Sequence, residues 1–342
     1  MLLERLSNAC GVSGDEGEVR DLLKEVLAPR VDEMWFDPMG NLIVRKGSGP
    51  VRVMLDAHMD EVGFLVGEIT DEGYVSLKKV GGLDDRVLPG RQVWLTHRRI
   101  PGVIGVKAWH LSSEAERKQV VPFEEMYVDL GCRSRAEVEA LGIEPGEPVY
   151  FATEFEWFGD RVAKGKALDD RVGCTVLARV LLEYDCPGIT LLGAFTVQEE
   201  VGLRGARAAA FHLNPDVALA LEGTGSANVA GVNPFDTITN MGEGPVISLM
   251  DAAGIPNKRV WNELVRLARL HGIRYQHRRL TSGGTNAGAI ALTREGVPAC
   301  TISVPCRYIH TNAALCHLDD VDGAVQLVRR FLESVEKGDF RP

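Results

Sequence analysis

The stretch that decides the fold runs Ile189-Thr190-Leu191-Leu192-Gly193-Ala194-Phe195-Thr196-Val197-Gln198-Glu199-Glu200-Val201-Gly202. Residues 189–197 are largely apolar, which is typical of a buried strand, and two acids and a glycine follow at once. A carboxylate at the end of a buried strand is costly unless a cation or a hydrogen-bond donor meets it. Because an isolated Glu-Glu pair is more often a solvated acidic turn, partners elsewhere in the chain must decide between the two interpretations.

Strand and helix patterns alternate on both sides of this stretch. Further strands are predicted at 51–58, 217–221 and 299–304, and helices at 172–182, 258–270 and 321–335. Another helix is expected to follow Ser13, which has the spacing of a capping box with Glu16, and to end before Pro29. This order predicts an α/β fold with a mainly parallel sheet and helices on both faces.

A region of different texture interrupts the α/β pattern. Between residues 65 and 159, short valine-rich runs at 92–95, 103–106 and 126–130 alternate with glycine and proline turns, which indicates a β-rich insert. A short helix at 134–141 and a strand at 146–151 are expected within it. The predicted organisation is a catalytic α/β domain made of residues 1–64 and 160–342, with residues 65–159 as a small insert domain.

The composition limits the class of protein and its partners. The 342 residues are 45% hydrophobic and 25% charged, which is ordinary for a globular protein. A net charge of -10 without a lysine- or arginine-rich block argues against nucleic acid or a membrane as the main partner. Seven cysteines without a Cys-x-x-Cys pair indicate reduced thiols, and no secretory leader is recognisable, so we expect a cytoplasmic protein.

Metal-capable side chains follow several of the predicted strands. The carboxyl ends of parallel strands meet at one edge of a sheet, so residues that follow them are expected to lie close together. The residues collected there are His58, Asp60, Glu199, Glu200, Glu222 and His310, to which we add Asp169 and Asp170 from just before a predicted helix. Two histidines with several carboxylates suit zinc or cobalt, and a carboxylate with two free oxygens can bridge two cations. The set is sufficient for two metal ions.

Each of these residues has a simpler explanation when it is taken alone. His58 would more often be a core histidine bonded to a backbone carbonyl, and Asp169 would more often cap a helix. Glu222 and His310 would each be an ordinary loop residue. Together, these explanations require several separate segments to place a metal-capable residue on one edge by accident, and we therefore favour a metal site.

Four segments carry a resemblance to a known family. They are Asp56-Ala57-His58-Met59-Asp60-Glu61-Val62-Gly63-Phe64, Ala167-Leu168-Asp169-Asp170-Arg171-Val172-Gly173, Gln198-Glu199-Glu200-Val201-Gly202-Leu203-Arg204-Gly205-Ala206 and Arg307-Tyr308-Ile309-His310. In this order and spacing they resemble the M42 family of dinuclear metallo-aminopeptidases, the glutamyl and tetrahedral aminopeptidases. Gly11-Val12-Ser13-Gly14 and Gly102-Val103-Ile104-Gly105 also look like that family. The resemblance covers essentially the whole chain.

The resemblance implies a division of roles among the collected residues. Asp169 would bridge two divalent metal ions, with Glu200 and His310 completing one site and His58 and Glu222 the other. Zinc and cobalt are the favoured metals, with manganese as an alternative. Glu199 would be the general base for a water that bridges the two metals, and Asp60 would orient His58.

The resemblance also implies features outside the metal ligands. The peptide bond after Asp169 would be a non-proline cis bond. The loop with Gly283, Gly284 and Thr285 would line the substrate pocket, where absent side chains let a substrate approach the backbone. The insert would mediate self-association, commonly into a hollow dodecamer, although a monomeric lid domain is the simpler alternative. Two positions depart from the family pattern, because Glu222 and Asn286 stand where Asp is usual.

The function that we expect is metal-dependent aminopeptidase activity on short peptides with free N-termini. The strongest rival is a glycoside hydrolase, because paired carboxylates are its usual machinery and members of the family are sometimes labelled endoglucanases. That alternative leaves His58, Asp169 and His310 without a role. A related metal-dependent deacylase or carboxypeptidase, and a noncatalytic metal-stabilised scaffold, are the remaining alternatives.

Overall fold

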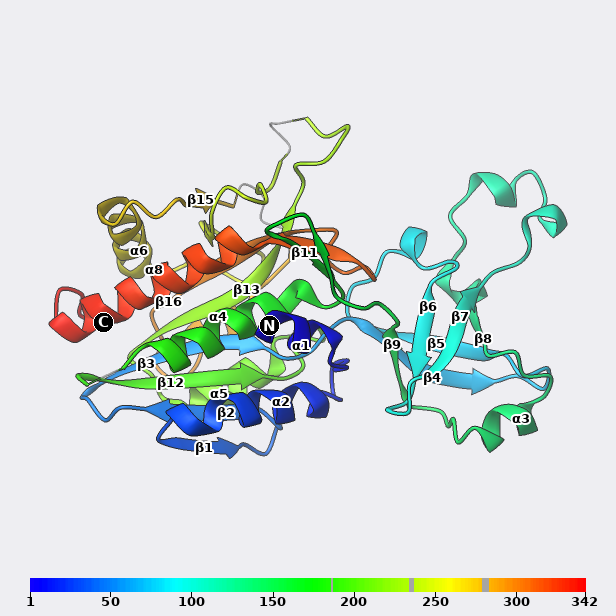
Figure 1. Cartoon of the computed structure of the whole chain (residues 1–342), viewed down its shortest axis with the longest axis horizontal. Coiled ribbons are helices and arrows are strands. Elements are labelled where there is room, and N and C mark those ends of the chain that lie inside the picture. The colour runs from blue at the N-terminus through cyan, green and yellow to red at the C-terminus, as the bar shows by residue number, and fades with distance from the viewer. Residues whose placement is uncertain (186, 234–236, 279–282) are drawn as a thin grey trace.

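The chain folds into a helix-covered sheet and a β-barrel, which lie on the left and the right of Figure 1. The computed structural model describes residues 1–185, 187–233, 237–278 and 283–342. Six cysteines in these ranges are free thiols, as expected, whereas the seventh, Cys186, lies outside the described residues. None of the helices in these ranges has the length and apolar character needed to cross a bilayer.

The large sheet has eleven strands in the described part of the chain. Its main path, from one edge to the other, is β1 (Glu33–Phe36), β2 (Leu42–Lys46), β12 (Ile189–Thr196), β3 (Val51–His58), β13 (Val217–Ser226), β16 (Ala299–Arg307), β17 (Ala314–His317), β11 (Val162–Gly165) and β10 (Glu156–Phe158). Two short strands beside this path are β14 (Val246–Ile247) and β15 (Gln276–His277).

The sheet is parallel at its centre and antiparallel at its flanks. The strands β12, β3, β13 and β16 are parallel neighbours. The pairs β1–β2, β2–β12, β16–β17, β17–β11 and β11–β10 are antiparallel. The prediction of a mainly parallel sheet is therefore not confirmed for the sheet as a whole. Short connections, which only antiparallel neighbours can have, join β1 to β2, β10 to β11 and β16 to β17, whereas the pairs β2–β12 and β17–β11 join strands that are far apart in the sequence.

Side-chain alternation along the central strands places a core on each face of the sheet. In β3, Val53, Leu55 and Ala57 belong to the larger core, and Met54 points into the smaller one. The larger core is covered by α1 (Leu2–Asn8), α2 (Gly17–Leu27), α4 (Leu168–Glu183), α6 (Lys258–Leu270) and α8 (Leu318–Lys337). The opposite face is covered by α5 (Arg204–Leu213) and α7 (Asn286–Ala291). Strands buried on both faces explain the near-continuous apolar runs in the sequence.

Most predicted elements occur with small shifts at their ends. The strand predicted at 51–58 and the helix at 258–270 are found with those bounds. The helix predicted at 172–182 begins earlier, at Leu168, and α1 was not predicted because it is a short segment that packs against α4.

The expected capping box at Ser13 is wrong. Helix α2 begins at Gly17, after Glu16, and the Glu16 side chain does not cap it. The hydroxyl of Ser13 instead donates to Oδ2 of Asp60 at 2.6 Å, and Oε1 of Glu16 accepts the backbone N–H of Gln198 at 3.1 Å. Tertiary partners at the end of the sheet have therefore replaced the local capping bonds.

The barrel consists of six short antiparallel strands that close on themselves. In order around the barrel they are β4 (Gly63–Ile69), β5 (Val75–Val80), β8 (Tyr127–Asp129), β7 (Ile100–Gly105), β6 (Gln92–Leu95) and β9 (Pro148–Phe151). It has a core of its own, around Phe64, Val93 and Val128, and one helix, α3 (Arg135–Ala140), capped by Ser134. Because β4 starts five residues after His58, the barrel begins beside the end of the central sheet.

Candidate metal centre

The predicted site residues, apart from Asp60 and Asp170, converge on one cleft at the carboxyl edge of the parallel strands. His58 ends β3, Glu222 lies in β13, and His310 follows β16, while Asp169 comes from the start of α4. These residues and the Glu199–Glu200 pair after β12 line a cleft of about 430 Å³. Five segments that are far apart in the sequence thus supply titratable side chains to one place.

Two groups of these side chains share Asp169, and a third is formed by His58 with Glu199 and Glu200. On one side, Nε2 of His58 lies 3.5 Å from Oδ1 of Asp169 and 3.6 Å from Oε2 of Glu222. On the other side, Nε2 of His310 lies 3.5 Å from Oδ2 of Asp169 and 3.2 Å from Oε1 of Glu200. Each group could hold a metal ion, and each oxygen of Asp169 faces a different group. This is the arrangement expected of a bridging carboxylate.

The electrostatics of the cleft also suit divalent cations. Burial raises the pKa of Glu222 well above its usual range, because its carboxylate is removed from water among other acids. Burial disfavours the charged form of His310, but the carboxylates of Asp169 and Glu200 outweigh this effect and raise its pKa to about 11. A raised pKa means that a carboxyl group resists losing its proton and that an imidazole keeps its proton. Both effects indicate that the cleft has an excess of buried negative charge, which bound cations would offset.

Both histidines are oriented by backbone carbonyls. Nδ1 of His58 lies 3.1 Å from the carbonyl oxygen of Asp60, and Nδ1 of His310 lies 2.9 Å from that of Gly82. An imidazole that donates through Nδ1 presents the lone pair of Nε2, the nitrogen that faces Asp169 here. Gly82 belongs to the segment after β5, so the barrel supplies one of the two orienting groups.

Asp60 has more contacts than its predicted role required. Its Oδ1 is 3.4 Å from Nδ1 of His58, farther than its own carbonyl oxygen. Its carboxylate instead accepts the backbone N–H of Glu199 at 2.9 Å and that of Glu200 at 3.1 Å. Asp60 therefore connects the segment that carries His58 to the segment that carries the paired acids.

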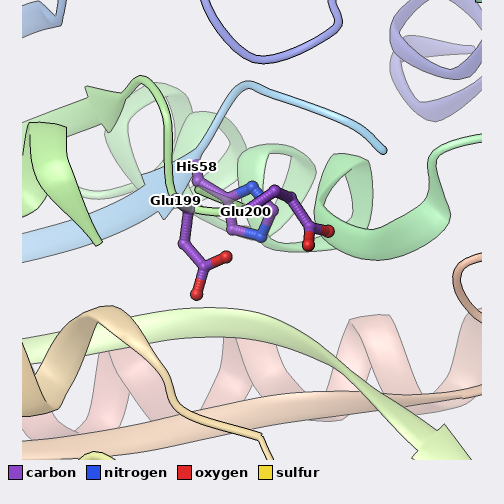
Figure 2. Close-up of side chains that lie close together, drawn as sticks. All are labelled: His58, Glu199 and Glu200. Carbon is purple, nitrogen blue, oxygen red and sulfur yellow. The ribbon is translucent and has the colours of Figure 1, made fainter. Parts of the chain in front are cut away.

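The two neighbouring glutamates point in different directions. Figure 2 shows the Glu199 and Glu200 carboxylates on different sides of the His58 ring, and each offers an oxygen within 4.8 Å of a ring nitrogen of His58. Glu200 faces His310, whereas Glu199 lines the cleft without an ion pair to either histidine within 4 Å among the described residues. Burial, followed by the charges of Glu200 and Asp169, raises the pKa of Glu199 to about 8, although His58 opposes this.

Asp170 contacts the backbone behind the site and does not line the cleft. Its Oδ2 accepts the backbone N–H of His58 at 3.1 Å, and its Oδ1 accepts that of Gly173 at 3.0 Å. The peptide bond between Asp169 and Asp170 is cis, as the resemblance implies. The sequence grouped Asp170 with the potential ligands, but its two backbone contacts show a supporting position.

The glycine-rich loop before α7 lies in the same cleft, and Asn286 follows it. Gly283, Gly284 and Thr285 all line the cleft, and the Thr285 hydroxyl donates to Oδ2 of Asp251 at 2.7 Å. The backbone N–H of Asn286 donates to Oε1 of Glu222 at 3.0 Å. The side-chain N–H of Asn286 donates to the hydroxyl of Thr196 at 3.1 Å, whereas its buried Oδ1 has no hydrogen-bond partner among the described residues.

Sequence reasoning missed several groups that support the site. The side-chain oxygens of Glu16 and Asn41 accept backbone N–H groups beside the paired acids, and the carbonyl oxygen of Gly82 faces His310. Because the other partner, or Gly82 itself, is a backbone group, such contacts leave no pattern in a single sequence. For Glu16, the sequence offered one signal. An acid near the predicted start of a helix can accept a hydrogen bond from another part of the chain and not from its own helix.

The sequence matches the model of a known family. The family is described as M42 glutamyl aminopeptidase, and the match covers residues 40–327. Among curated proteins, the putative aminopeptidase FrvX of Escherichia coli is 36% identical over 98% of this chain and 95% of its own.

Solved structures of related aminopeptidases share the whole fold. The TET aminopeptidase of Thaumarchaeota archaeon SCGC AB-539-E09 superposes with a TM-score of 0.95 at 36% identity, covering 99% of this chain and 98% of its own. The TET1 peptidase of Pyrococcus horikoshii has a TM-score of 0.87 at 33% identity, covering 97% and 99% of the two chains. That peptidase is described as assembling into a tetrahedron or a large octahedral shell.

Proposed function

The chain belongs to the M42 family of aminopeptidases and is a peptide-bond hydrolase, and from this premise we propose that it removes N-terminal residues from short peptides with the help of two divalent metal ions. The observation that carries the proposal is the position of Asp169 between two histidine–carboxylate groups, with Glu199 in the same cleft. Neither group needs a residue from another chain.

Two metal sites are proposed on either side of Asp169. His58 and Glu222 would complete one site, and Glu200 and His310 the other. Zinc and cobalt suit this mixture of imidazole and carboxylate ligands, and manganese is an alternative. Metal ions held there would supply positive charge that lowers the pKa of a water molecule shared between them towards neutrality and polarises the peptide carbonyl.

Glu199 is proposed as the general base. Its carboxylate would accept a proton from the attacking water as the water oxygen bonds to the peptide carbon, and would then deliver that proton to the departing amine nitrogen. The contrast with Glu200 supports this role, because Glu200 pairs with His310, whereas Glu199 makes no ion pair with a histidine within 4 Å among the described residues. Asp60 would hold the backbone of Glu199 in place.

The substrate is proposed to lie against the loop before α7. Gly283 and Gly284 have no side chains, so a peptide can approach their backbone groups, and Thr285 forms the wall beside them. The negative charge of the cleft suits the free amine of a peptide N-terminus. Arg278 also lines the cleft, and its positive charge can select substrates by the charge of their first side chain.

The rival enzyme classes are less well supported. A glycoside hydrolase would use Glu199 with a second carboxylate and would leave the two histidines beside Asp169 without a function. Two of the relatives reported above are described as aminopeptidases and the third as a peptidase. A related deacylase or carboxypeptidase would use the same metals, and only its substrates would differ.

One comparison separates these classes. Purified protein is assayed on a panel of aminoacyl p-nitroanilides, N-acylated versions of them and soluble cellulose, before and after metal removal and reconstitution with zinc, cobalt or manganese. We expect hydrolysis of the free-amine substrates that disappears with chelator and returns with metal. Activity on cellulose or on N-acylated substrates alone would reject the aminopeptidase assignment.

We further propose that residues 65–159, which contain the barrel except for the first two residues of β4, mediate self-association into a dodecamer. The support is the likeness to peptidases that form closed shells and the barrel's separate core. Light scattering should give a mass about twelve times that of the 37.3 kDa subunit. A monomeric mass would favour the lid-domain alternative.

A cytoplasmic location is proposed from the free thiols. Six described cysteines are unpaired, which suits a reducing compartment. Fractionation of the native host followed by immunodetection tests this, and recovery from the culture medium would contradict it.

A further inference from the structure

The segment that carries Glu199 and Glu200 is held by side chains through its backbone. Four consecutive N–H groups donate to side-chain oxygens from other parts of the chain. The N–H groups of residues 197, 198, 199 and 200 donate in turn to Oδ1 of Asn41 at 2.9 Å, Oε1 of Glu16 at 3.1 Å, Oδ1 of Asp60 at 2.9 Å and Oδ2 of Asp60 at 3.1 Å. The acceptors come from three separate segments, so the position of the two glutamates depends on tertiary contacts.

Glu16 occupies an unusual position for this contact. It precedes α2, where a carboxylate ordinarily accepts N–H groups of its own helix, yet its side chain makes no such bond. Its Oε1 instead accepts the N–H groups of Gly14 at 2.7 Å and of Gln198. The side chain is buried, with Glu16 only 5% exposed, and burial raises its pKa to about 7. One of the two backbone donors to this buried carboxylate is therefore a tertiary partner, the N–H of Gln198.

The backbone at Gln198 needs such a partner. Gln198 has a φ of 57°, in the left-handed region that residues other than glycine avoid at a cost of about 1 kcal/mol. This bend lies between the end of β12 and Glu199, so the conformation of Gln198 determines the direction in which the backbone enters Glu199. An acceptor fixed at the N–H of Gln198 holds the bend in one conformation.

We propose that Glu16 is a positioning residue for catalysis, which keeps the Glu199 carboxylate in register with the metal sites by anchoring the N–H of Gln198. The inference rests on the proposed function, in which Glu199 is the general base. Glu16 lies outside the cleft lining and touches neither substrate nor metal. It acts through the backbone of the adjacent residue, where a small displacement of a catalytic group is expected to reduce the rate strongly.

The other end of the same strand supplies a matched control. Glu336 in α8 accepts the N–H of Gly188, just before β12, at 2.6 Å, and the hydroxyl of Tyr184 at 2.7 Å. Glu16 and Glu336 thus each hold a backbone amide beside β12, but only Glu16 is next to the paired acids. A general loosening of β12 would follow from losing either contact, whereas misplacement of Glu199 would follow only from losing the contact of Glu16.

The experiment compares Glu16→Met, Glu16→Gln and Glu336→Met in metal-loaded protein. Glu16→Met should lower kcat about tenfold or more with KM within about twofold, because a displaced base affects the chemical step more than substrate binding. Glu16→Gln keeps an acceptor oxygen and should stay within about threefold of the wild type. Glu336→Met should leave kcat unchanged. Should Glu16→Met not fold, Glu16→Asp, whose carboxylate is one methylene short of Gln198, takes its place with the same expected direction.

A second measurement separates failure of the inference from failure of the proposed function. Amide hydrogen exchange read by mass spectrometry should be several-fold faster in peptides covering 197–203 in Glu16→Met, and unchanged there in Glu16→Gln and Glu336→Met. This holds even if the wild type proves to have no aminopeptidase activity, which would reject the proposed function alone. Wild-type kcat in Glu16→Met of an active enzyme, or unchanged exchange in 197–203, would overturn the positioning role.

Discussion

The Oδ1 atom of Asp60 lies 2.9 Å from the backbone nitrogen of Glu199 and accepts its hydrogen bond. The same carboxylate accepts the N–H of Glu200 and the hydroxyl of Ser13, while the carbonyl oxygen of Asp60 faces Nδ1 of His58. One residue therefore fixes the orientation of a proposed metal ligand and the backbone of the proposed base. A substitution at Asp60 should therefore affect both metal binding and proton transfer.

Asp60→Asn tests this double role. An amide has one acceptor oxygen, so at least one of the donors at Ser13, Glu199 and Glu200 would lose its partner and would face an N–H₂ group instead. We expect kcat to fall by about 100-fold and metal affinity to weaken, as measured by steady-state kinetics and competition with a chelating dye.

Asp320→Asn is the matched control for Asp60→Asn. Asp320 is also buried and also accepts two backbone N–H groups, those of Gly242 and Gly244, both at 2.7 Å. This variant should lose stability without losing metal affinity. An equal loss of metal affinity in both variants would mean that Asp60 acts only through general stability.

His310→Ala should release metal from one side of the centre. Its Nε2 faces both Asp169 and Glu200, and removing the imidazole leaves that side with carboxylates alone. Elemental analysis after dialysis should show about one metal equivalent fewer per subunit, with activity reduced by at least about 100-fold. His97→Ala, which removes an exposed histidine paired with Asp15, is the control and should leave metal content unchanged. Unchanged stoichiometry in His310→Ala would exclude it as a ligand.

Glu16 should make the stability of the metal-free protein depend on pH. Its pKa rises from 4.5 to about 7 in the folded protein because of burial, so the folded state binds more protons than the unfolded state between these values. Stability must then fall as pH rises from about 4.5 to about 7, by about 3 kcal/mol if the whole shift is expressed.

Glu16→Gln isolates this contribution. The amide does not titrate, so the variant should match the wild type near pH 4.5 and exceed it in stability above pH 7. Denaturant unfolding of both proteins across this range gives the difference. A difference that stays constant with pH would show that Glu16 has the same pKa folded and unfolded.

The sequence was sufficient to locate the central strands and the residues that follow them. The apolar runs of β3 and β12 are continuous because both faces of the sheet are covered, and such runs are visible without a structure. The converging residues His58, Glu200, Glu222 and His310 could be collected because parallel strands bring their carboxyl ends to one edge. The roles of these residues came from the family resemblance and remain proposals.

The sequence was misleading where tertiary contacts replaced local ones. Ser13 and Glu16 have the spacing of a capping box, yet Asp60 and the N–H of Gln198 provide their partners. The outer strands of the sheet are antiparallel, as in the pairs β1–β2 and β16–β17. The direction of a strand depends on the path of the chain between strands, which a local apolar pattern does not reveal. The contact from Gly82 to His310 uses a carbonyl oxygen, which every residue has, so no residue type could reveal it.

The account depends most on the claim that Glu199 and Glu200 have different functions although they are adjacent. Matched Glu199→Gln and Glu200→Gln variants test it when metal content and turnover are measured on the same preparations. We predict that Glu199→Gln keeps two metal ions per subunit and loses at least about 100-fold in kcat, whereas Glu200→Gln loses metal along with activity. Near wild-type turnover in Glu199→Gln, or the same metal content in both variants, would contradict the assignment of base and ligand.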